Sequence, residues 1–600
     1  MEQAIVDSPP FQRLRRIRQL GMVHLVYPGA THTRFSHALG ALRVVQDLLD
    51  IVLNQRNGRH ADLDLFQQWE ERFGSLVPKR RGQREPVKEF ELKIAEAVVL
   101  ARLGSLLHDL CHVPYGHTIE DDLKLLTPHD ENKERLGFYW ESLGNNGKES
   151  DFTAVQNILN KAPLRKALRI ILLSKVHEKA PDVRLREMER YPFVADLVTN
   201  TICADLLDYL PRDHNFTGLP VELGQRFMSA FYVLPAEEGE EKLHYQERMA
   251  LRLSDDGRER HDIKSELLKH LRYRYELQER AIVHHAKLAA DSMLGKALEL
   301  WYRDLKEDAA KKAGGGNVSS VVDRGGEPDE VWSALERDVG IKEASEVEAG
   351  VKTHVENRVR TLGDDSLLEY LAGALESPDD APPVGARVRA LARDVLDRRL
   401  YKRAAEARRT GTKGRLYELF KSRSKQRSLE RAAAHFAGVP EEHVVIWLPD
   451  PKMRLKVAEV LVDFGHGVAP FEQHSEQAHE IYKSHEDLWT ATVFVHRKVK
   501  EDKLDAVVLA RLAELMGVEW DRHQPRSANQ PQQWPICLAA SRELDEDLLE
   551  AELKNLLELE ATKKAAHRTS ADLTFADLCA EIAPHAKKIK ARRKAGAVPG

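Results

Sequence analysis

The sequence predicts a mainly α-helical protein with a helical core, a second helical lobe and a small α/β lobe toward the carboxyl end. Apolar residues recur at spacings of three and four in residues 37–53 and 91–107, which is the period of a helix that buries one side. Glycine and proline stand mainly at the junctions between such segments. Residues 443–450 and 489–499 differ: they are β-branched and aromatic runs bounded by proline or charged residues, and they predict strands.

The same patterns divide the 600 residues into four parts. A chain of this length can build two or more domains with sizeable cores. The predicted parts are a helical core over 1–310, a helical lobe over 311–440, an α/β lobe over 441–530, and an amphipathic helix with a basic tail over 531–600. A charged insertion over about residues 56–88 interrupts the core and is expected to form an exposed loop. The α/β lobe has no catalytic residues of its own, so we expect it to serve regulation or assembly.

Linkers and helices alternate in the second lobe. Residues 311–320 and 376–385 carry the glycine, serine and proline content of linkers. The helices predicted between and after them are residues 334–339, 364–375 and 386–407. A charged segment over residues 237–260 is expected to be a flexible cover or a subunit contact.

Composition favours an intracellular protein. The 91 Lys and Arg residues nearly balance the 96 Asp and Glu residues, so no global basic field predicts nucleic-acid binding. The four cysteines form no CxxC pair, which fits a reducing cytosol. Neither a run of about 18 apolar residues nor a signal-peptide core is present, so we expect a soluble, cytoplasmic protein without a membrane partner. The basic residues 586–596 are more typical of a solvated chain end than of a nucleic-acid contact.

A His-Asp pair and two further residues form a candidate metal site. His37 stands in TRFSHALG, His108 and Asp109 in LLHDLCHVPYGH, and Asp205 in ICADLLDYLPRD. Mixed nitrogen and oxygen ligands suit iron, manganese, zinc or a related metal. A chance His-Asp pair is expected among 26 histidines. Here, however, His108 and Asp109 end an apolar helix, where buried polar groups are costly unless something such as a cation compensates.

More polar groups follow the pair, namely His112, His117, Glu120 and His129. His117 and Glu120 are three residues apart, so on a helix they share a face, and the carboxylate there would orient the imidazole for general acid-base work. The alternative is a solvated, charge-tuned helix, because clusters of this kind do not always mark sites. We favour the catalytic interpretation.

Residues 8–40, with LLHDLCHVPYGH, PHDEN and CADLLDYLPRDHNFTG, resemble the HD-domain deoxynucleoside triphosphate triphosphohydrolases. This family includes bacterial dGTPases and, more similar to this chain, the vertebrate SAM-and-HD-domain enzyme. The resemblance is strong over residues 1–218 and weaker beyond, and no SAM domain is expected because the HD module begins almost at Met1. It implies an HD-domain helical fold. It also implies hydrolysis of dNTPs to deoxynucleoside and triphosphate, by attack of metal-activated water on the α-phosphorus.

The resemblance implies a role for each matching residue. The metal ligands, for a divalent ion such as Mn, Fe, Mg or Zn, are His37, His108, Asp109 and Asp205. The phosphate-facing and catalytic residues are His112, His117, His129 and Glu120. The substrate-binding residues are Gln19, Arg34, Tyr209 and Asp213. In this scheme Glu120 holds His117, which donates a proton to the leaving 5′-oxygen. Arg34 reaches a phosphate, Gln19 and Asp213 hold the sugar 3′-hydroxyl, and Tyr209 packs on the sugar and excludes a 2′-hydroxyl.

Departures from the family pattern leave the preferred base open. Leu206 replaces a lysine that follows the last metal ligand, and the loss of a charged contact to phosphate costs on the order of 1.5–3 kcal/mol. Ile282 replaces the aromatic residue beside the base. Cys111 replaces a glycine next to the His-Asp pair, where we expect a small, buried and inert side chain.

A regulatory nucleotide is a further expectation from the resemblance. The matching residues are Asp7, Gln12, Arg15 and Arg398. In the vertebrate enzyme the first three positions read a guanine between subunits and the last holds its phosphates, so a homo-oligomer is expected. Aspartate and arginine suit the donors and acceptors of guanine. Residues 13–20 are equally typical of an ordinary basic helix face, so both interpretations stay open.

Other classes of function use the same residues. A nucleotidase, a phosphodiesterase or a single-strand nuclease would keep the metal ligands and release different products. A non-catalytic nucleotide sensor would bind dNTPs through Arg34 and Gln19 and would tolerate the loss of His117.

Overall fold

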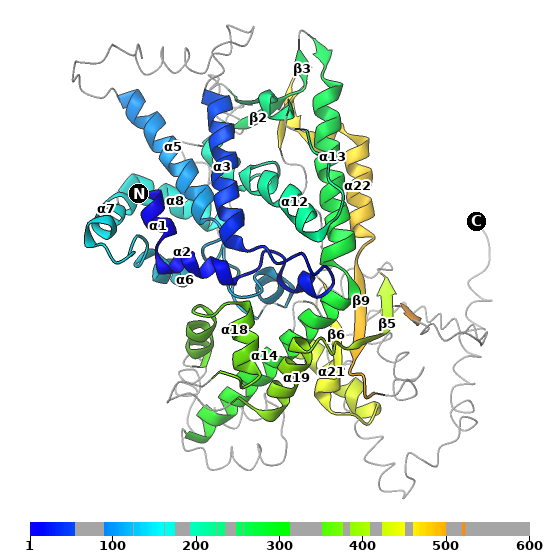
Figure 1. Ribbon diagram of the computed structural model, residues 1–600. Coiled ribbons are helices and arrows are strands. Elements are labelled where there is room, and N and C mark those ends of the chain that lie inside the picture. The colour runs from blue at the N-terminus through cyan, green and yellow to red at the C-terminus, as the bar shows by residue number, and fades with distance from the viewer. Residues whose placement is uncertain are drawn as a thin grey trace, which may run out of the picture.

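The computed structural model describes residues 1–53, 89–123, 125–160, 162–174, 192–224, 226–234, 248–255, 257–312, 351–375, 384–408, 420, 423–449, 460–499 and 519–522. These residues are mostly helical, with small sheets, which confirms the predicted fold class (Figure 1). The predicted insertion over 56–88, the helix over 334–339, most of both linkers and the parts beyond residue 522 lie outside the described residues. None of the described helices is long and apolar enough to cross a membrane.

The helical segments follow in sequence order, first those up to Leu277 and then those beyond it. The earlier ones are α1 (Glu2–Val6), α2 (Pro9–Gln12), η1 (Arg13–Arg16), η2 (Gly21–Leu25), α3 (Arg34–Leu53), α5 (Glu89–Leu107), η5 (Thr118–Asp122), α6 (Lys133–Trp140), α7 (Glu149–Leu159), α8 (Ala162–Leu172), α11 (Pro192–Thr199), α12 (Ala204–Thr217), η6 (Arg226–Ala230) and α13 (His261–Leu277). The later ones are η8 (Gln278–Ile282), α14 (His285–Lys312), α18 (Asp364–Leu371), α19 (Ala386–Leu396), α21 (Arg423–Phe436), η9 (Glu441–His443), η10 (Phe471–His474) and α22 (Glu476–Glu486).

Helix α3 is central to the first core and packs against α5 and α12 (Figure 1). Its buried residues Ala38, Ala41, Val45 and Leu48 recur at spacings of three and four, as the sequence predicts. Gly40 allows α12 to approach closely, because a Cβ there would collide with the Asp208 carboxylate and the Arg212 guanidinium. The two helices that carry His37 and Asp205 are therefore held in direct contact.

A second core surrounds α14, which packs against α19 in the lower part of Figure 1. This core includes Tyr115, Ile119 and Leu123 from the segment that follows α5. Gly295 on α14 gives that segment room, since a Cβ at this position would lie 2.8 Å from the Leu123 side chain. The segment that carries the predicted catalytic histidines thus packs against α14 in the second core.

Two four-stranded sheets join distant parts of the chain. The first has the order β1 (Phe231–Val233), β2 (Met249–Arg252), β7 (Leu461–Asp463) and β8 (Val468–Pro470), with β2 parallel to β7 and the other pairs antiparallel. The second is antiparallel, with the order β10 (Glu519–Arg522), β5 (Lys402–Arg408), β9 (Thr490–Val495) and β6 (Val444–Trp447). A two-stranded ribbon pairs β3 (Ser254–Asp255) with β4 (Arg258–Glu259).

These strands confirm two predictions and overturn others. The expected strands within residues 443–450 and 489–499 are β6 and β9. The expected helix over residues 386–407 is wrong beyond Leu396, because Arg398 has φ +53° and the chain continues as β5. Ala405 and Ala407 are buried in that strand, so burial against β9 outweighs the helix propensity of alanine. Of the two expectations for residues 237–260, a flexible cover is wrong over Met249–Arg252, where β2 is buried and paired, and a subunit contact stays a prediction.

The predicted division of the chain at residue 441 cuts across both sheets. Each sheet combines strands from before and after this position.

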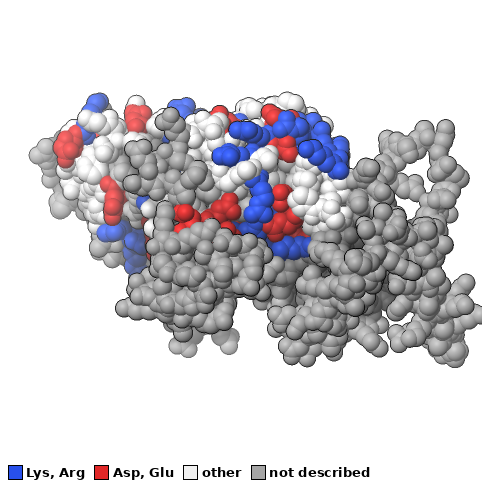
Figure 2. Space-filling model, turned by 90° about the horizontal axis from the view of Figure 1, so that it is seen from below, with Lys and Arg blue, Asp and Glu red and all other residues white. Residues whose placement is uncertain are grey.

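On the lower face of the molecule, basic and acidic side chains are interspersed over the described part (Figure 2). The described residues of that face therefore form no broad field of one sign.

Candidate active site

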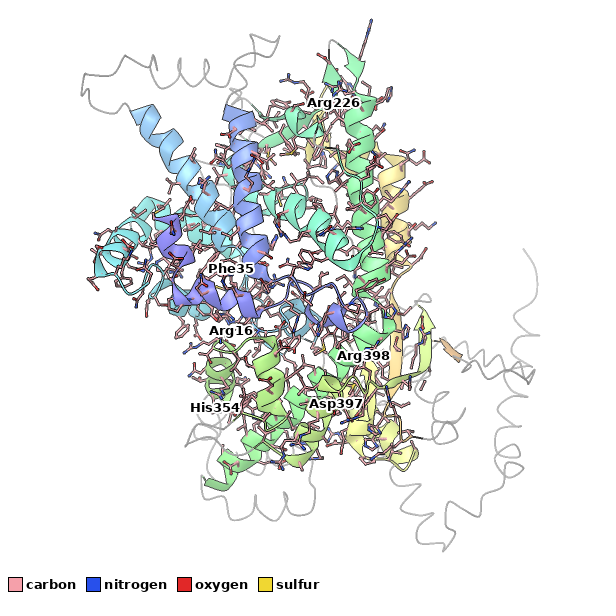
Figure 3. All side chains as sticks on the ribbon, viewed as in Figure 1. Arg16, Phe35, Arg226, His354, Asp397 and Arg398 are labelled. Carbon is pink, nitrogen blue, oxygen red and sulfur yellow. The ribbon has the colours of Figure 1, made fainter. Side chains whose placement is uncertain are left out.

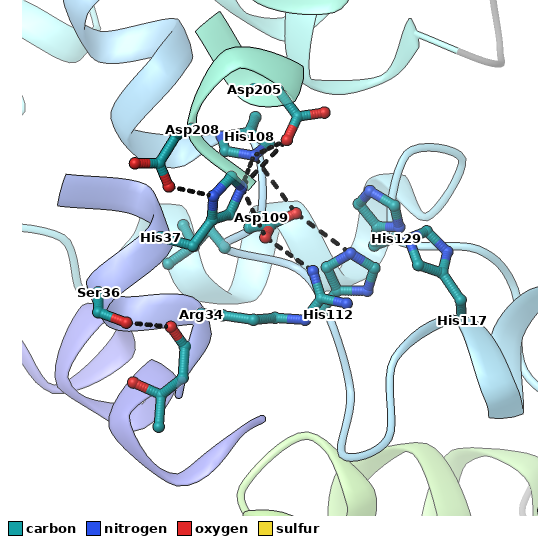
Figure 4. Close-up of polar contacts among 12 residues, drawn as sticks. Arg34, Ser36, His37, His108, Asp109, His112, His117, His129, Asp205 and Asp208 are labelled. Atoms are coloured by element: carbon teal, nitrogen blue, oxygen red, sulfur yellow. Dashed lines mark hydrogen bonds and ion pairs between the residues drawn. The ribbon is translucent and has the colours of Figure 1, made fainter. Parts of the chain in front are cut away.

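Three helical segments bring three predicted metal ligands together, and we call His37, His108 and Asp205 the metal group (Figure 4). His37 Nε2 lies 3.1 Å from His108 Nε2 and 3.0 Å from Asp205 Oδ1. His108 Nε2 lies 3.6 Å from the same Asp205 oxygen. Metal bonds to these atoms are about 2.0–2.2 Å long, which places neighbouring ligand atoms about 3 Å apart. The donor atoms therefore fit one divalent cation.

The outer nitrogen of each imidazole is fixed by a hydrogen bond. His37 Nδ1 pairs with Asp208 Oδ2 at 2.9 Å, and His108 Nδ1 pairs with the Ser105 carbonyl at 2.7 Å. A carbonyl only accepts, so His108 Nδ1 carries a proton, and Nε2 of the neutral ring presents its lone pair to the group. Sequence reasoning missed Asp208, although it stands three residues after Asp205 and so on the same face of a helix.

Burial lowers the pKa of His37, but hydrogen bonds to Asp205 and Asp208 and the nearby Asp109 outweigh burial and raise that pKa to about 10. The same pairing lowers the pKa of Asp205, although burial alone would raise it. The carboxylates of Asp205, Asp208 and Asp109 thus surround His37, and their negative charge favours a bound cation.

Asp109 links the metal group to Arg34 and His112. Its Oδ2 accepts a hydrogen bond from Arg34 Nη1 at 2.7 Å and lies 3.7 Å from His37 Nε2. Its Oδ1 lies 3.5 Å from His108 Nε2 and 3.2 Å from His112 Nε2. Burial would raise the pKa of Asp109, but Arg34 and the histidines hold it well below its usual value. All four predicted metal ligands are therefore adjacent, with Arg34 beside them.

The remaining predicted catalytic residues form a second group, the histidine group, made of His112, His117, Glu120 and His129. Their ligand atoms lie within 4.8 Å of one another, so by distance they too could hold an ion. The His112 and His129 rings stack at 3.6 Å. Glu120 is buried and already engaged: Oε1 accepts from Arg135 at 2.8 Å, while Oε2 contacts His112 and His129 at 2.8 and 3.3 Å. Because Arg135 already supplies a positive charge, we do not assign a metal here.

The predicted pairing of His117 with Glu120 is wrong. Residues 118–122 form a π-helical turn instead of an α-helix, so the three-residue spacing does not align the two side chains. Glu120 turns toward His112, and His117 Nδ1 pairs with Asp121 Oδ2 at 2.6 Å. Sequence reasoning did not single out Asp121 or Arg135. The four-residue spacing of His117 and Asp121 could have predicted their contact. The contact between Arg135 and Glu120, in contrast, depends on tertiary packing.

His112 and His117 differ in their environments. Burial, together with Arg34 and His129, lowers the pKa of His112 to about 4. Partial desolvation by the surrounding protein lowers the pKa of His117, but the hydrogen bond to Asp121 outweighs this effect, and the net pKa is raised. The His117 side chain is 58% exposed, so this imidazole can meet a ligand while it is protonated. Opposite shifts in neighbouring titratable groups are typical of acid-base sites.

The predicted sugar-binding residues lie beside His32, which sequence reasoning missed. His32 Nε2 pairs with Asp213 Oδ1 at 2.7 Å, and the His32 carbonyl accepts from the Gln19 backbone N–H at 3.0 Å. The Gln19 side-chain oxygen is buried without a hydrogen-bond partner, which leaves an acceptor for a ligand hydroxyl. The Tyr209 ring is 6.4 Å from the His37 ring, which places this residue next to the metal group.

The structure divides the predicted regulatory residues between two places. Arg15 donates to Gln12 at 2.8 Å and lies over the Phe35 ring, while Asp7 follows α1. Arg398 instead donates to the Leu25 carbonyl at 2.8 Å, and Figure 3 shows Phe35 and Arg398 in separate regions. A nucleotide site that uses all of them stays a prediction.

The three residues that differ from the family pattern are buried or partly buried. Leu206 is buried, and Ile282 packs partly buried against the same core. Cys111 is buried too, and burial raises the pKa of its thiol to about 12, as expected for an inert side chain.

Comparison with known proteins relates the chain to HD-domain proteins. Residues 384–527 match a family model described as the HD associated region. The HD domain-containing protein L394 of Acanthamoeba polyphaga mimivirus is 32% identical over 123 residues, which are 20% of this chain and 22% of that protein. Deoxynucleoside triphosphate triphosphohydrolase SAMHD1 of Homo sapiens is 34% identical over 117 residues, which are 19% of this chain and 13% of that protein. The matches thus span less than a quarter of the length of these two curated relatives.

A phosphohydrolase structure from Bacteroides thetaiotaomicron aligns with 82% of this chain and 95% of its own, at 17% identity and a TM-score of 0.44. This likeness is too low to support an inference about the site.

Proposed function

Since the chain is a relative of the HD-domain proteins, we propose that it is a metal-dependent phosphohydrolase that converts dNTPs to deoxynucleosides and triphosphate. The observation that carries the proposal is the metal group: two Nε2 atoms face each other at 3.1 Å, and Asp205 closes the set. The finer choice of substrate is supported by the SAMHD1 relatives, which are named as deoxynucleoside triphosphate triphosphohydrolases.

A divalent cation in the metal group would supply Lewis-acid activation of water and positive charge beside the phosphates. The protein would do the remaining work. Asp208 and the Ser105 carbonyl orient the two imidazoles. Arg34 stays charged next to Asp109 and retains a buried Nε without a hydrogen-bond partner, so it can donate to a phosphoryl oxygen.

Proton transfer would fall to His117. Its pairing with Asp121 favours the protonated ring, which can donate to the leaving 5′-oxygen. On the sugar side, Gln19 and Asp213 would bind the 3′-hydroxyl. His32 contacts both, through its ring to the Asp213 carboxylate and through its carbonyl to the Gln19 backbone N–H. Leu206 adds no charge, so phosphate binding would rely on Arg34 and the histidine group.

Product analysis tests this function. The purified protein is incubated with each dNTP, each NTP and single-stranded DNA in the presence of Mn, Fe, Mg or Zn, and the products are separated by chromatography. We expect triphosphate and deoxynucleoside from dNTPs alone. Release of orthophosphate or a nucleoside monophosphate would point to another phosphohydrolase class. Binding of dNTPs without any turnover would identify a sensor.

Two histidine variants sharpen this test. His37→Ala removes one ligand of the metal group and should abolish turnover and metal retention together. His261→Ala removes a histidine whose side chain is 79% exposed, and it should leave both unchanged. Mixtures of dNTPs then test regulation, because activation of one substrate's hydrolysis by a second nucleotide requires a second site.

A further inference from the structure

Asp364, the first residue of α18, contacts two distant loops that each carry a predicted active-site residue. One loop contains Tyr115, two residues before His117. The other contains Arg18, directly before Gln19. Asp364 is completely buried, although it lies more than 200 residues beyond both loops in the sequence. A buried carboxylate requires compensating partners, and here both loops supply them.

Every oxygen of Asp364 is engaged. Oδ1 accepts from the Tyr115 backbone N–H at 2.8 Å, and Oδ2 accepts from the Arg18 backbone N–H at 2.9 Å. The Asp364 carbonyl accepts from the Tyr115 hydroxyl at 2.9 Å. The Arg18 guanidinium lies 3.7 Å from Asp364 and donates to Asp365 at 2.8 Å. One side chain therefore fixes the positions of two loops relative to each other.

The Tyr115 loop needs such support because its backbone is strained. Tyr115 has φ +61°, a region that residues with a Cβ rarely occupy. Gly116 follows with φ +40°, and a Cβ there would lie 2.7 Å from Arg34 Nη2. His117 directly follows this turn, and the conformation of the turn depends on contacts with residues outside it. Strain of this kind persists only where the surroundings over-determine the conformation.

Other contacts from the second helical lobe reach the histidine group. Glu356 pairs with Arg135 at 2.6 Å, and Arg135 in turn pairs with Glu120 at 2.8 Å. Gly363, beside Asp364, packs so close to the first core that a Cβ would lie 2.6 Å from the Arg16 carbonyl oxygen. The lobe thus contacts the active-site loops at several points, with Asp364 shared between them.

We infer that Asp364 is a positioning residue, which couples the second helical lobe to the loops that carry His117 and Gln19. The inference rests on the proposed function for its effect on turnover. Its structural part, the restraint of both loops, can be measured without any substrate.

Asp364→Asn tests the inference, because the amide keeps the size of the side chain but presents one NH2 group to a backbone N–H that needs an acceptor. We expect kcat for dNTP hydrolysis to fall by about tenfold to a hundredfold, as misplacement of catalytic groups does, with bound metal per chain unchanged. The matched control is Asp365→Asn. This carboxylate also pairs with Arg18 but is 65% exposed, so kcat should change by no more than about twofold.

Amide hydrogen exchange supplies the readout that needs no activity. In Asp364→Asn, exchange should rise in residues 16–20 and 113–123 and stay unchanged in α13. The inference would be overturned if both loops exchanged at the same rate in Asp364→Asn as in wild type, or if exchange rose evenly over the whole chain. It would also be overturned if exchange rose in both loops while kcat stayed unchanged. If wild type hydrolyses no dNTP, the proposed function fails while the exchange experiment still decides the role of Asp364.

A milder variant covers the case in which Asp364→Asn does not fold. Tyr115→Phe removes only the hydroxyl bond to the Asp364 carbonyl. It should raise exchange in residues 113–123 to a smaller extent, and a Tyr115→Phe protein identical to wild type in both kcat and exchange would contradict the inference.

Discussion

At the scale of residues, the proposed function depends on the partners that orient the reactive side chains. His37 would bind a cation through Nε2 only while Asp208 keeps Nδ1 engaged. Arg34 is oriented by Asp109, and His117 by Asp121. Each of these carboxylates fixes the direction of a neighbouring donor, so each should be as sensitive to substitution as the group it orients.

Asp208→Asn should weaken metal binding about 10–100-fold, because it removes the carboxylate that orients His37 and raises its basicity. Competitive titration with a metal-binding dye measures the affinity. Arg212→Gln is the matched control, since Arg212 pairs with Asp208 but does not contact the imidazole. Equal metal affinity in Asp208→Asn and wild type would show that His37 needs no partner.

The pH dependence of turnover should reveal His117. Proton donation requires the charged ring, whose pKa is raised, so activity should fall as pH rises through that pKa. Asp121→Asn removes the interaction that raises the pKa, and the alkaline limb of the kcat profile should move to lower pH. Asp47→Asn breaks an exposed pair of the same spacing on α3 and should leave the profile in place. An unshifted limb in Asp121→Asn would exclude His117 as the titrating acid.

At the scale of elements, the site depends on how closely α3 and α12 approach. Gly40→Ala should destabilise the protein by about 1–3 kcal/mol, because the new Cβ collides with Asp208 and Arg212. Gly137→Ala on α6 is the matched control: nothing lies within 4 Å of its Cβ position, and alanine should stabilise that helix by about 0.5–1 kcal/mol. Urea denaturation measures both. A Gly40→Ala protein as stable as wild type would mean that the helices can separate without cost.

The elements also show which features the sequence can predict. The helices around His37 and His108 were predictable because their apolar residues repeat with the helical period. The proximity of His37, His108 and Asp205 was predictable from motif and resemblance. The pairing of His117 was not, because the period of an α-helix does not describe a π-helical turn. Strand β5 was missed because its pairing with β9 overrides local propensity. Asp364 and Arg135 act through residues far away in the sequence, which no local pattern records.

At the scale of the whole molecule, metal binding should contribute to stability. A ligand that binds only the folded state adds about 2.7 kcal/mol when its free concentration is 100 times its Kd. Chelation should therefore lower the Tm, and added metal should restore it. His37→Ala provides the comparison, because its Tm should not respond to either treatment. A wild-type Tm that is indifferent to chelator and to metal would contradict a cation in the metal group.

The sheet that joins β1 and β2 to β7 and β8 sets an order for biosynthesis. Strand β2 obtains its parallel partner only when the segment around Leu461 has left the ribosome, long after every residue of the metal group has been made. Until then β2 presents an open strand edge, which is a surface that other chains can pair with. A fragment ending at residue 310 would keep the metal group and this edge, and it should aggregate more than the full chain by light scattering. The nascent chain thus contains the metal group and the histidine group well before this sheet is complete.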